Sequence, residues 1–386
     1  MAARTARIGT GTVGLVAAAA LAAASFTSPA SAVAGPGHTQ TQQAMDTAVE
    51  EGVPGVTGQA TEANSLWTGT SGVGNLKTGA PRSSVDRYRI GSMTKTFVAT
   101  VMLQLEAEGR IDLDSTVDTL LPGVVRGNGN DGRRITVRQL LNHTSGIPSY
   151  TTDPEFLENG FTVKFLEHRY DTYTPAQLVE IALRQKPLFD PGTSWSYSNT
   201  NYILAGMIIE KVTGHPYEDE IRQRVINPLG LYGTSVPRTA SSMPVPSSRA
   251  YSKLSLTPQP ADPAYDVTEL NPSAAASAGA MISTSADLDR FYSALLGGRL
   301  LPAKQLKEMT TTVPVSGYGM ITAYGLGLMR FSPSCGVTVW GHGGNIQGSA
   351  SQAVTSADGT HSLAFNFNGD WAGNSEAVIE AEYCPK

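Results

Sequence analysis

The chain has 386 residues, of which 40% are hydrophobic and 16% charged, and its formal net charge at pH 7 is −5. This length and apolar fraction are enough to bury a full core, in one large domain or two interleaved ones. The slight excess of acidic residues leaves no basic stripe of the kind that binds nucleic acid, so we expect no nucleic-acid partner.

Residues 1–32 have the pattern of a secretory signal peptide. Arg4 and Arg7 precede an apolar run over residues 13–26, and Ala30-Ser31-Ala32 supplies the small residues of a cleavage site. A retained membrane anchor is the alternative, but the run is shorter than the about 20 residues that a spanning helix needs. We therefore expect cleavage after residue 32 and a secreted mature protein.

The segments that follow change from helical to strand-like and back. A helical pattern covers residues 41–51, and short runs broken by glycine over 55–91 are typical of strands and turns. Apolar residues then recur every fourth position from Phe97 to Leu105, and Gly109 ends the pattern as a C-cap. The sequence predicts a second helix of about four turns there, with Ser92 at its N-terminus.

The middle of the chain is helical in character and its C-terminal part is strand-like. The segments GVTVWGHGGN, SASQAVTS and HSLAFNFNG alternate or run apolar, and residues 357–359 between the last two have hairpin chemistry. We predict an α/β (α+β) fold with an antiparallel sheet flanked by helices. Residues 33–110 and 285–386 would form a split α/β domain, and residues 111–284 a mostly helical inserted domain.

The chain contains two cysteines, Cys335 and Cys384, both near the C-terminus. In the oxidising environment of a secreted protein we expect such a pair to form a disulfide. The six histidines show no compact metal-binding spacing. We therefore expect no metal site and no cofactor.

The stretch RYRIGSMTKTF places Ser92 three residues before Lys95 at the start of the predicted helix. Residues i and i+3 share a helix face, so Lys95 can reach Ser92 across one turn. A lysine can take the serine proton only if burial or a neighbouring cation keeps it neutral. The alternative is that Ser92 caps the helix and Lys95 is a solvated first-turn residue, which is the commoner case for an isolated S-x-x-K.

Two further motifs accompany this one: the only Y-x-N, Tyr197-Ser198-Asn199, and the only H-x-G, His342-Gly343-Gly344. Each is weak alone. Tyr197 could be a core aromatic with Asn199 in a turn, and His342 could be a strand histidine bonded to a backbone carbonyl. Their order along the chain is the feature that favours an enzyme.

In this order, SMTK, YSN and HGG resemble the three motifs of the penicillin-recognising serine hydrolases, a β-lactamase-related family. That family includes D-alanyl-D-alanine carboxypeptidases, class C β-lactamases and related D-amino-acid peptidases and esterases. The chain is most similar to the secreted Streptomyces D-alanyl-D-alanine carboxypeptidase type, which shares the H-x-G form, GSMTKTF-like and LLNHTSGI-like segments, and the cysteine pair. The resemblance implies a β-lactamase/DD-peptidase-like fold.

The resemblance also implies a role for each motif residue. Ser92 would attack a carbonyl and form an acyl-enzyme, and Lys95 would take and relay its proton. Tyr197 would pass a proton to the leaving amine, and Asn199 would hydrogen-bond the acyl side chain and Lys95. His342 would stand where many relatives have lysine and keep a positive potential near the substrate.

The oxyanion hole would then consist of the backbone N–H groups of Ser92 and Asn345. Whether Lys95 or an ionised Tyr197 is the acylation base stays open at this stage.

Departures from the carboxypeptidase pattern affect the predicted substrate-binding residues, Gly343, Gly344, Asn345 and Met329. Gly343 and Asn345 replace hydroxyl-bearing residues, and Met329 replaces an arginine that helps to hold the substrate's terminal carboxylate. Arg330 is adjacent, but neighbouring residues of a strand face opposite sides. Recognition of a free carboxylate is therefore in doubt.

From these motifs we expect a secreted serine hydrolase that acts through an acyl-enzyme, first as a D-alanyl-D-alanine carboxypeptidase-type peptidase. The alternative is a D-stereospecific amidase, aminopeptidase or esterase of the same family. A β-lactamase and a non-catalytic penicillin binder rank lower. Expected partners are a D-amino-acid-containing peptide or peptidoglycan stem peptide, with β-lactams as covalent inhibitors, and we expect a monomer.

Overall fold

The computed structural model describes residues 37–63 and 65–385. The predicted signal peptide, residues 1–32, lies outside the described residues. Among the helices that are described, none has the length and hydropathy to cross a membrane.

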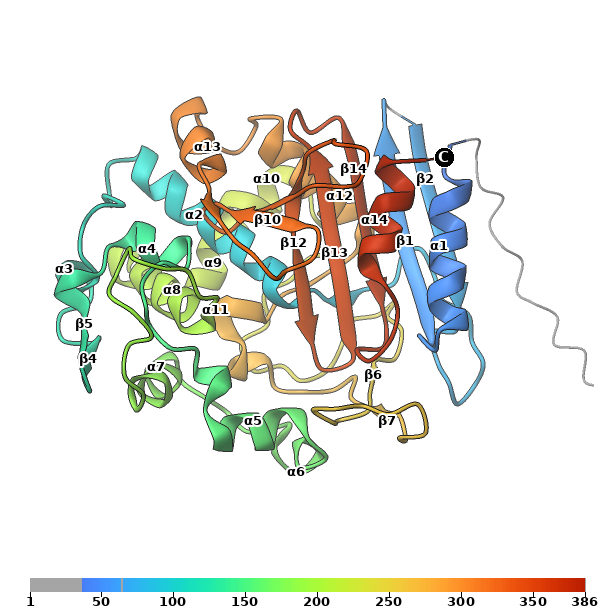
Figure 1. Cartoon of the computed structure of the whole chain (residues 1–386), viewed down its shortest axis with the longest axis horizontal. Coiled ribbons are helices and arrows are strands. Elements are labelled where there is room, and N and C mark those ends of the chain that lie inside the picture. The colour runs from blue at the N-terminus through green and yellow to red at the C-terminus, as the bar shows by residue number, and fades with distance from the viewer. Residues whose placement is uncertain (1–36, 64, 386) are drawn as a thin grey trace, which may run out of the picture. The chain divides into compact units, whose positions relative to one another are not determined.

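An antiparallel sheet of eight strands organises the molecule, in the order β2-β1-β14-β13-β12-β11-β10-β9. Figure 1 shows its long central strands between two sets of helices. The predicted antiparallel sheet flanked by helices is thus confirmed. The strands are β1 (Gly55–Glu62), β2 (Ser65–Gly72), β9 (Val313–Pro314), β10 (Ile321–Tyr324), β11 (Met329–Phe331), β12 (Val339–Ile346), β13 (Ser349–Ser356) and β14 (His361–Phe367).

Short two-residue strands form three further pairs outside this sheet. They are β3 (Tyr88–Arg89) with β8 (Ile282–Ser283), β4 (Arg126–Gly127) with β5 (Asn130–Asp131), and β6 (Tyr251–Ser252) with β7 (Tyr265–Asp266). The first pair lies next to the S-x-x-K motif, because β3 ends three residues before Ser92.

One face of the sheet is covered by α1 (Thr39–Glu50) and α14 (Ser375–Tyr383), which also pack on each other. A hydrophobic cluster lies between them and the strands, with Val56, Phe365 and Ile379 at its centre. The other face packs against α12 (Ser285–Leu296). The helix expected over residues 41–51 corresponds to α1, and the expected 357–359 hairpin connects β13 to β14.

The larger hydrophobic cluster surrounds α2 (Thr94–Ala107) and α8 (Asn199–Thr213). Most residues of α2 are buried, so it is a core helix rather than an amphipathic surface helix. The remaining helices are α3 (Val117–Leu120), α4 (Val137–Leu141), α5 (Pro154–Phe161), α6 (Phe165–His168), α7 (Pro175–Leu183), α9 (Tyr217–Ile221), α10 (Asn227–Leu229), α11 (Ala276–Gly279) and α13 (Ala303–Thr310). The predicted division at residues 110 and 285 stays a prediction.

Candidate active site

Ser92 lies in a single 3₁₀ turn, Gly91–Met93, immediately before α2. Its side chain does not cap that helix, because the start of α2 has no side-chain cap hydrogen bond. Lys95 belongs to the first turn of α2 and is fully buried. Both parts of the alternative interpretation, a capping serine and a solvated lysine, therefore differ from the structure.

The Lys95 amine contacts three oxygen atoms. Its Nζ lies 2.9 Å from Ser92 Oγ, 2.8 Å from Asn199 Oδ1 and 2.7 Å from Ala278 O. The amide and backbone oxygens can only accept hydrogen bonds, so two N–H groups must point at them. The third position of Nζ faces Ser92, and in the neutral amine that position is a lone pair. A neutral Lys95 is thus oriented to accept the Ser92 proton.

Burial lowers the pKa of Lys95 well below its ordinary value, because the charged amine is removed from water. No carboxylate contributes to the pKa of Lys95 and offsets this effect. A lysine that acts as a base has to lie close to the hydroxyl and be removed from water, and Lys95 meets both conditions.

Tyr197 and Asn199 reach the same point from the start of α8. The Lys95 Nζ lies 4.9 Å from the centroid of the Tyr197 ring. Within the described residues, the Tyr197 hydroxyl is shielded from solvent and makes no hydrogen bond of ordinary geometry, although Ser92 is near enough to act on its pKa as a hydrogen-bonding group. Burial raises the pKa of Tyr197, and the neighbouring Ser92 lowers it in part. The phenol is therefore protonated at neutral pH, which favours Lys95 over Tyr197 as the base.

Glycine in the third motif allows β12 to approach the Ser92 turn. A Cβ atom on Gly344 would lie 1.9 Å from the carbonyl oxygen of Ile90, a contact that no side chain tolerates. β11 pairs only with residues 339–341 of β12, so residues 342–346 pair with β13 alone. The other edge of this part of β12 faces the Ser92 turn, which places Asn345 beside Ser92.

His342 differs from the expectation of a positively charged side chain near the substrate. It is fully buried, and this burial is the main cause that lowers the pKa of His342 to about 3. Its Nδ1 lies 2.5 Å from the carbonyl oxygen of Gly343, and its Nε2 lies 3.0 Å from the Tyr324 hydroxyl. His342 is neutral at physiological pH and, as in the alternative interpretation of the sequence, bonds a backbone carbonyl.

The hydrogen bonds of His342 continue to His143, which the sequence analysis did not single out. The backbone N–H of Ser198 donates to His143 Nδ1 over 3.2 Å, so the proton of this neutral ring is on Nε2. His143 Nε2 lies 3.2 Å from the Tyr324 hydroxyl and can donate to it. Tyr324 can then donate to His342 Nε2, and His342 Nδ1 to Gly343.

We call these three hydrogen-bonded side chains the His143–Tyr324–His342 chain. When all three are neutral, each ring nitrogen and the hydroxyl among them has a hydrogen-bond partner. Burial also lowers the pKa of His143 well below its ordinary value. The chain joins the Y-x-N segment to the third-motif strand. His143 belongs to the LLNHTSGI segment, which was the available signal, whereas nothing in the sequence indicated Tyr324.

Met329 is not brought toward Ser92. It is paired with Gly341 and packs against the hydrophobic cluster beneath α1 and α14. Arg330 is paired with Trp340 and so shares the sheet face of His342, where its Nε donates to Thr322 Oγ1 over 3.3 Å. The predicted substrate-binding role of Met329 is therefore not supported by its position.

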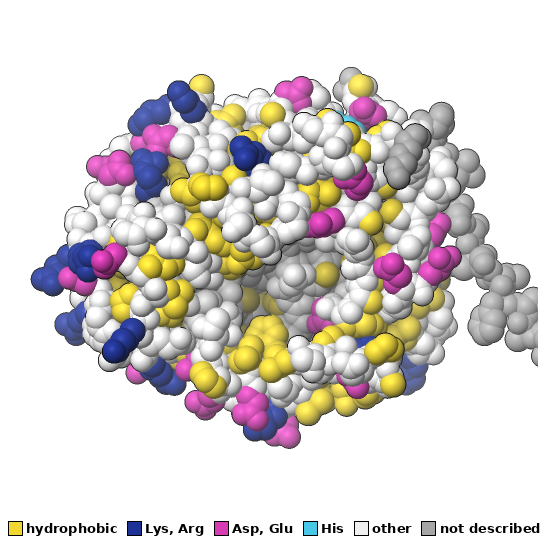
Figure 2. Space-filling model, in the orientation of Figure 1, with side chains coloured by type: hydrophobic (Ala, Val, Ile, Leu, Met, Phe, Trp, Pro, Cys, Tyr) yellow, Lys and Arg dark blue, Asp and Glu magenta, His cyan; other side chains and the backbone are white. Residues whose placement is uncertain are grey.

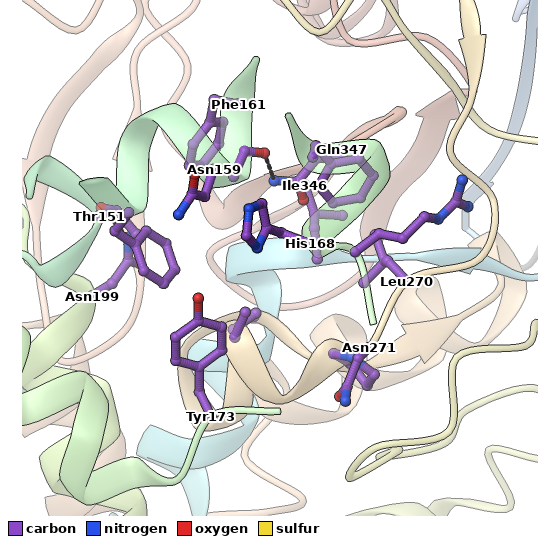
Figure 3. Close-up of a pocket in the computed structure, with 18 of the residues that line it drawn as sticks. Thr151, Asn159, Phe161, His168, Tyr173, Asn199, Leu270, Asn271, Ile346 and Gln347 are labelled. Carbon is purple, nitrogen blue, oxygen red and sulfur yellow. Dashed lines mark hydrogen bonds between the residues drawn. The ribbon is translucent and has the colours of Figure 1, made fainter. Parts of the chain in front are cut away.

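A pocket opens next to Ser92, Asn199 and Asn345, and its volume is about 130 Å³. Figure 2 shows a hollow near the middle of this face, with hydrophobic side chains along its rim. In Figure 3, Asn159 lies above the pocket and Tyr173 below it, with Thr151 on the left and Ile346 and Gln347 on the right. The pocket is mostly apolar, although Arg169 and Asp171 are among its lining residues, and such a pocket beside a reactive serine is suited to the acyl part of a substrate.

Trp195 is one of the residues that line a second, open cavity of about 610 Å³. The ring of Trp195 is 6.4 Å from that of Tyr197. Residues 192–196 and 313–318 provide most of the cavity's lining, and none of the lining residues is charged. In the part of the chain that the structure describes, no group of three or more His, Cys, Asp or Glu side chains is placed to hold a metal ion.

Cys335 and Cys384 form a disulfide. It joins the connection between β11 and β12 to the residue that follows α14. The cross-link therefore ties the C-terminus of the described chain to the strand that carries His342.

Comparison with known proteins identifies the family. The Beta-lactamase family model matches residues 39–376. A crystal structure of a D-stereospecific amidohydrolase from Streptomyces sp. is 60% identical, with a TM-score of 0.86 over 91% of this chain and 100% of that one. The D-amino acid amidase from Ochrobactrum anthropi SV3, complexed with D-phenylalanine, is 29% identical, with a TM-score of 0.76 over 89% of this chain and 97% of that one.

Penicillin-binding proteins are also among the relatives. Penicillin-binding protein 4 of Amycolatopsis lactamdurans is 29% identical over 79% of this chain and 74% of its own length. The chain spans about half the length, 52%, of the Bacillus subtilis protein PbpX, to which it is 30% identical. Since the family model matches well over half of the residues, the chain belongs to the beta-lactamase family of serine hydrolases.

Proposed function

We propose that this protein hydrolyses the amide or ester bond of D-amino acid derivatives through an acyl-enzyme at Ser92. The observation that carries the proposal is the position of the Lys95 amine, which is desolvated and has its third bonding direction on Ser92 Oγ. This arrangement makes a nucleophile of a hydroxyl that is otherwise unreactive.

In the acylation step, Ser92 Oγ bonds to the substrate carbonyl carbon while its proton moves to Lys95 Nζ. Backbone N–H groups of Ser92 and Asn345 stabilise the oxyanion. The bond to the leaving nitrogen or oxygen then breaks, and the leaving group receives a proton through the unpartnered Tyr197 hydroxyl, which regains one from Lys95. Water next attacks the acyl carbon and gives one proton to Lys95 Nζ, the bond to Ser92 Oγ breaks, and Lys95 returns that proton to Ser92 Oγ.

The leaving-group side favours neutral substrates over those that end in a free carboxylate. A carboxylate taken into a cleft needs charge-assisted partners to offset its desolvation. The pKa of His342, lowered to about 3 chiefly by burial, leaves that ring without a charge. The similarity to a D-stereospecific amidohydrolase also supports amide and ester substrates over those that end in a free carboxylate.

The acyl side favours an apolar side chain of moderate size. The pocket beside Ser92 measures about 130 Å³, close to the roughly 150 Å³ of an apolar cavity that binds benzene. The amidase of Ochrobactrum anthropi binds D-phenylalanine. We therefore take the amide and the methyl ester of D-phenylalanine as the reference donors.

A D-alanyl-D-alanine carboxypeptidase is the second candidate, and one observation favours it. Arg330 lies on the same sheet face as His342, and a movement of its side chain away from Thr322 would bring a cation toward the leaving group. The similarity to penicillin-binding proteins supports covalent acylation of Ser92 by β-lactams under either candidate. Export with removal of residues 1–32 remains part of the proposal.

The deciding experiment compares kcat/KM for three donors of the D-phenylalanyl group: the amide, the methyl ester and the free-acid dipeptide D-phenylalanyl-D-alanine. We expect the amide and ester to exceed the free acid by at least tenfold, and each L-enantiomer to be at least a hundredfold slower. A hundredfold preference for the free acid, about 2.7 kcal/mol of transition-state binding, would establish the carboxypeptidase instead.

A further inference from the structure

The far end of the acyl pocket is closed by one side chain. Gln347, in the turn between β12 and β13, donates a hydrogen bond from Nε2 to the carbonyl oxygen of Gly160 over 2.7 Å. Gly160 is near the end of α5, on the opposite wall of the cleft. Figure 3 shows this bond as a dashed line, with Phe161 beside it.

A second cavity begins behind this bond. It measures about 330 Å³, and its lining includes Leu254 and Trp371. Four residues line both this cavity and the acyl pocket, namely Phe161, Asn345, Ile346 and Gln347. They form the wall between the two spaces, and Gln347 is the one that bonds across it.

The segment held by Gln347 is fixed at both ends and bridges the cleft between them. Phe156 anchors one end, with its ring 5.0 Å from that of Tyr150. Phe165 anchors the other end in a hydrophobic cluster with Leu254 and Leu270. Residues 157–164, which we call the strap, connect the two anchors.

The Gln347 side of the bond is rigid. The backbone N–H of the next residue, Gly348, donates to Asp370 Oδ2 over 2.8 Å, and Gly348 has a positive φ of +75° that suits the tight turn. Within the strap, residues 157–161 belong to α5 and Phe161 also packs against the larger hydrophobic cluster. Because these contacts remain when one neutral hydrogen bond breaks, the Gln347 bond can open without loss of the fold.

We propose that the strap, held by Gln347, limits the acyl side of the substrate to one D-residue with an unextended amino end. This inference rests on the proposed function and specifies its substrate class. A donor that is acylated or peptidyl-extended at its amino group has to pass the wall and enter the second cavity. The protein would therefore act on terminal aminoacyl amides and esters, and poorly on the same residue within a longer chain.

The test compares N-acetyl-D-phenylalanine methyl ester with D-phenylalanine methyl ester by kcat/KM. In Gln347→Ala, which opens the wall, we expect the ratio of extended to free donor to rise at least tenfold over the wild type. Gln347→Met keeps most of the side-chain bulk without the donor, so its ratio should rise less. Gln223→Ala, at an exposed position in the π-helical segment Arg222–Ile226, is the matched control and should leave the ratio unchanged.

Hydrogen–deuterium exchange gives a second readout that needs no substrate. Exchange of the amides of residues 158–164 should become faster in Gln347→Ala and Gln347→Met, and not in Gln223→Ala. If exchange does not change, Gln347 does not hold the strap and the proposal is wrong. If exchange rises but the donor ratio stays within twofold of the wild type, the strap does not set specificity and the proposal is equally wrong.

The failure of the proposed function can be recognised separately. The dependence of kcat/KM on the length of the acyl group is also measured with two simple esters, 4-nitrophenyl acetate and 4-nitrophenyl decanoate. Any acyl-enzyme hydrolase of this kind can act on them. If no D-aminoacyl donor is turned over, the proposed function is wrong, and the plain esters still decide whether opening the strap favours the longer acyl group. Should Gln347→Ala not fold, Gln347→Met carries both readouts.

Discussion

Lys95 and His342 are both fully buried basic side chains of the same site, but their hydrogen bonds lead to different partners. Two of the three neighbours of Lys95 Nζ are pure acceptors and the third is the Ser92 hydroxyl. Both ring nitrogens of His342 are engaged by Gly343 and Tyr324, neither of which can react. Burial keeps both groups neutral, and it is the orientation of the free lone pair that makes Lys95 the base.

The largest expected effect follows from removing this base. Lys95→Met should lower the rate of Ser92 acylation by about 10³-fold or more, within the range that proton transfer supplies. His342→Asn should cost about tenfold, since that ring only supports the strand. Burst-phase kinetics with a chromogenic ester measure both. Equal losses in the two variants would remove the distinction between a base and a supporting residue.

Tyr197→Phe tests the proton delivery to the leaving group, which follows next in size. The change removes only the unpartnered hydroxyl, so the fold should be unaffected while acylation by an amide falls by about 10²-fold. Esters carry a better leaving group and should lose less. If amide and ester acylation fall by the same factor, the hydroxyl does not act on the leaving group.

Tyr324→Phe should have a smaller effect, because Tyr324 acts through His342 rather than on the substrate. The change leaves His342 Nε2 and His143 Nε2 without their shared partner. We expect kcat to fall by about tenfold or less with KM nearly unchanged, and the acid limb of the kcat profile to move as His342 becomes easier to protonate. An unchanged pH profile would show that the His143–Tyr324–His342 chain does not govern the charge of His342.

The smallest effect is on stability. The pKa of His342 is about 3 in the folded protein, lowered chiefly by burial, against about 6.5 for an ordinary histidine. Below pH 6.5 the unfolded chain takes up a proton that the folded chain refuses, so the free energy of unfolding falls as pH falls. The buried ring contributes at most about 1.4 kcal/mol per pH unit to this slope.

Urea denaturation between pH 6.5 and 4.5 measures the slope in the wild type and in His342→Asn. We expect a shallower dependence in the variant, because one of the two buried histidines that differ between the folded and unfolded chains, His342 and His143, has been removed. Identical slopes would mean that His342 is protonated in the folded protein, contrary to its assignment as a neutral group.

Contacts between residues close in the sequence could be predicted, but contacts that depend on the packing of distant segments could not. The i, i+3 spacing of Ser92 and Lys95 was enough to place one beside the other. The charge state of His342 depends on its complete burial in the fold, which no local pattern reports. Strand alternation correctly separated Met329 from Arg330, but the face on which each would lie depended on their pairing with β12.

The C-terminal strands and the helix expected over residues 41–51 were visible in the sequence because each has a clear apolar period. The strap was not, since Gln347 and Gly160 are separated by 187 positions and joined by a single bond. Nothing in the pattern around either residue distinguishes it from an ordinary turn or helix end.

The central claim is that Lys95 is neutral and faces the Ser92 hydroxyl, and a direct titration of its amine tests it. Protein labelled with ¹⁵N at the lysine Nζ atoms would be followed by NMR from pH 5 to pH 11, with Lys95→Met identifying the Lys95 signal. We predict a Lys95 pKa well below the about 10.4 of an ordinary lysine, so that the amine is largely neutral where the enzyme acts. A Lys95 signal that stays in the charged form through pH 9 would contradict this account.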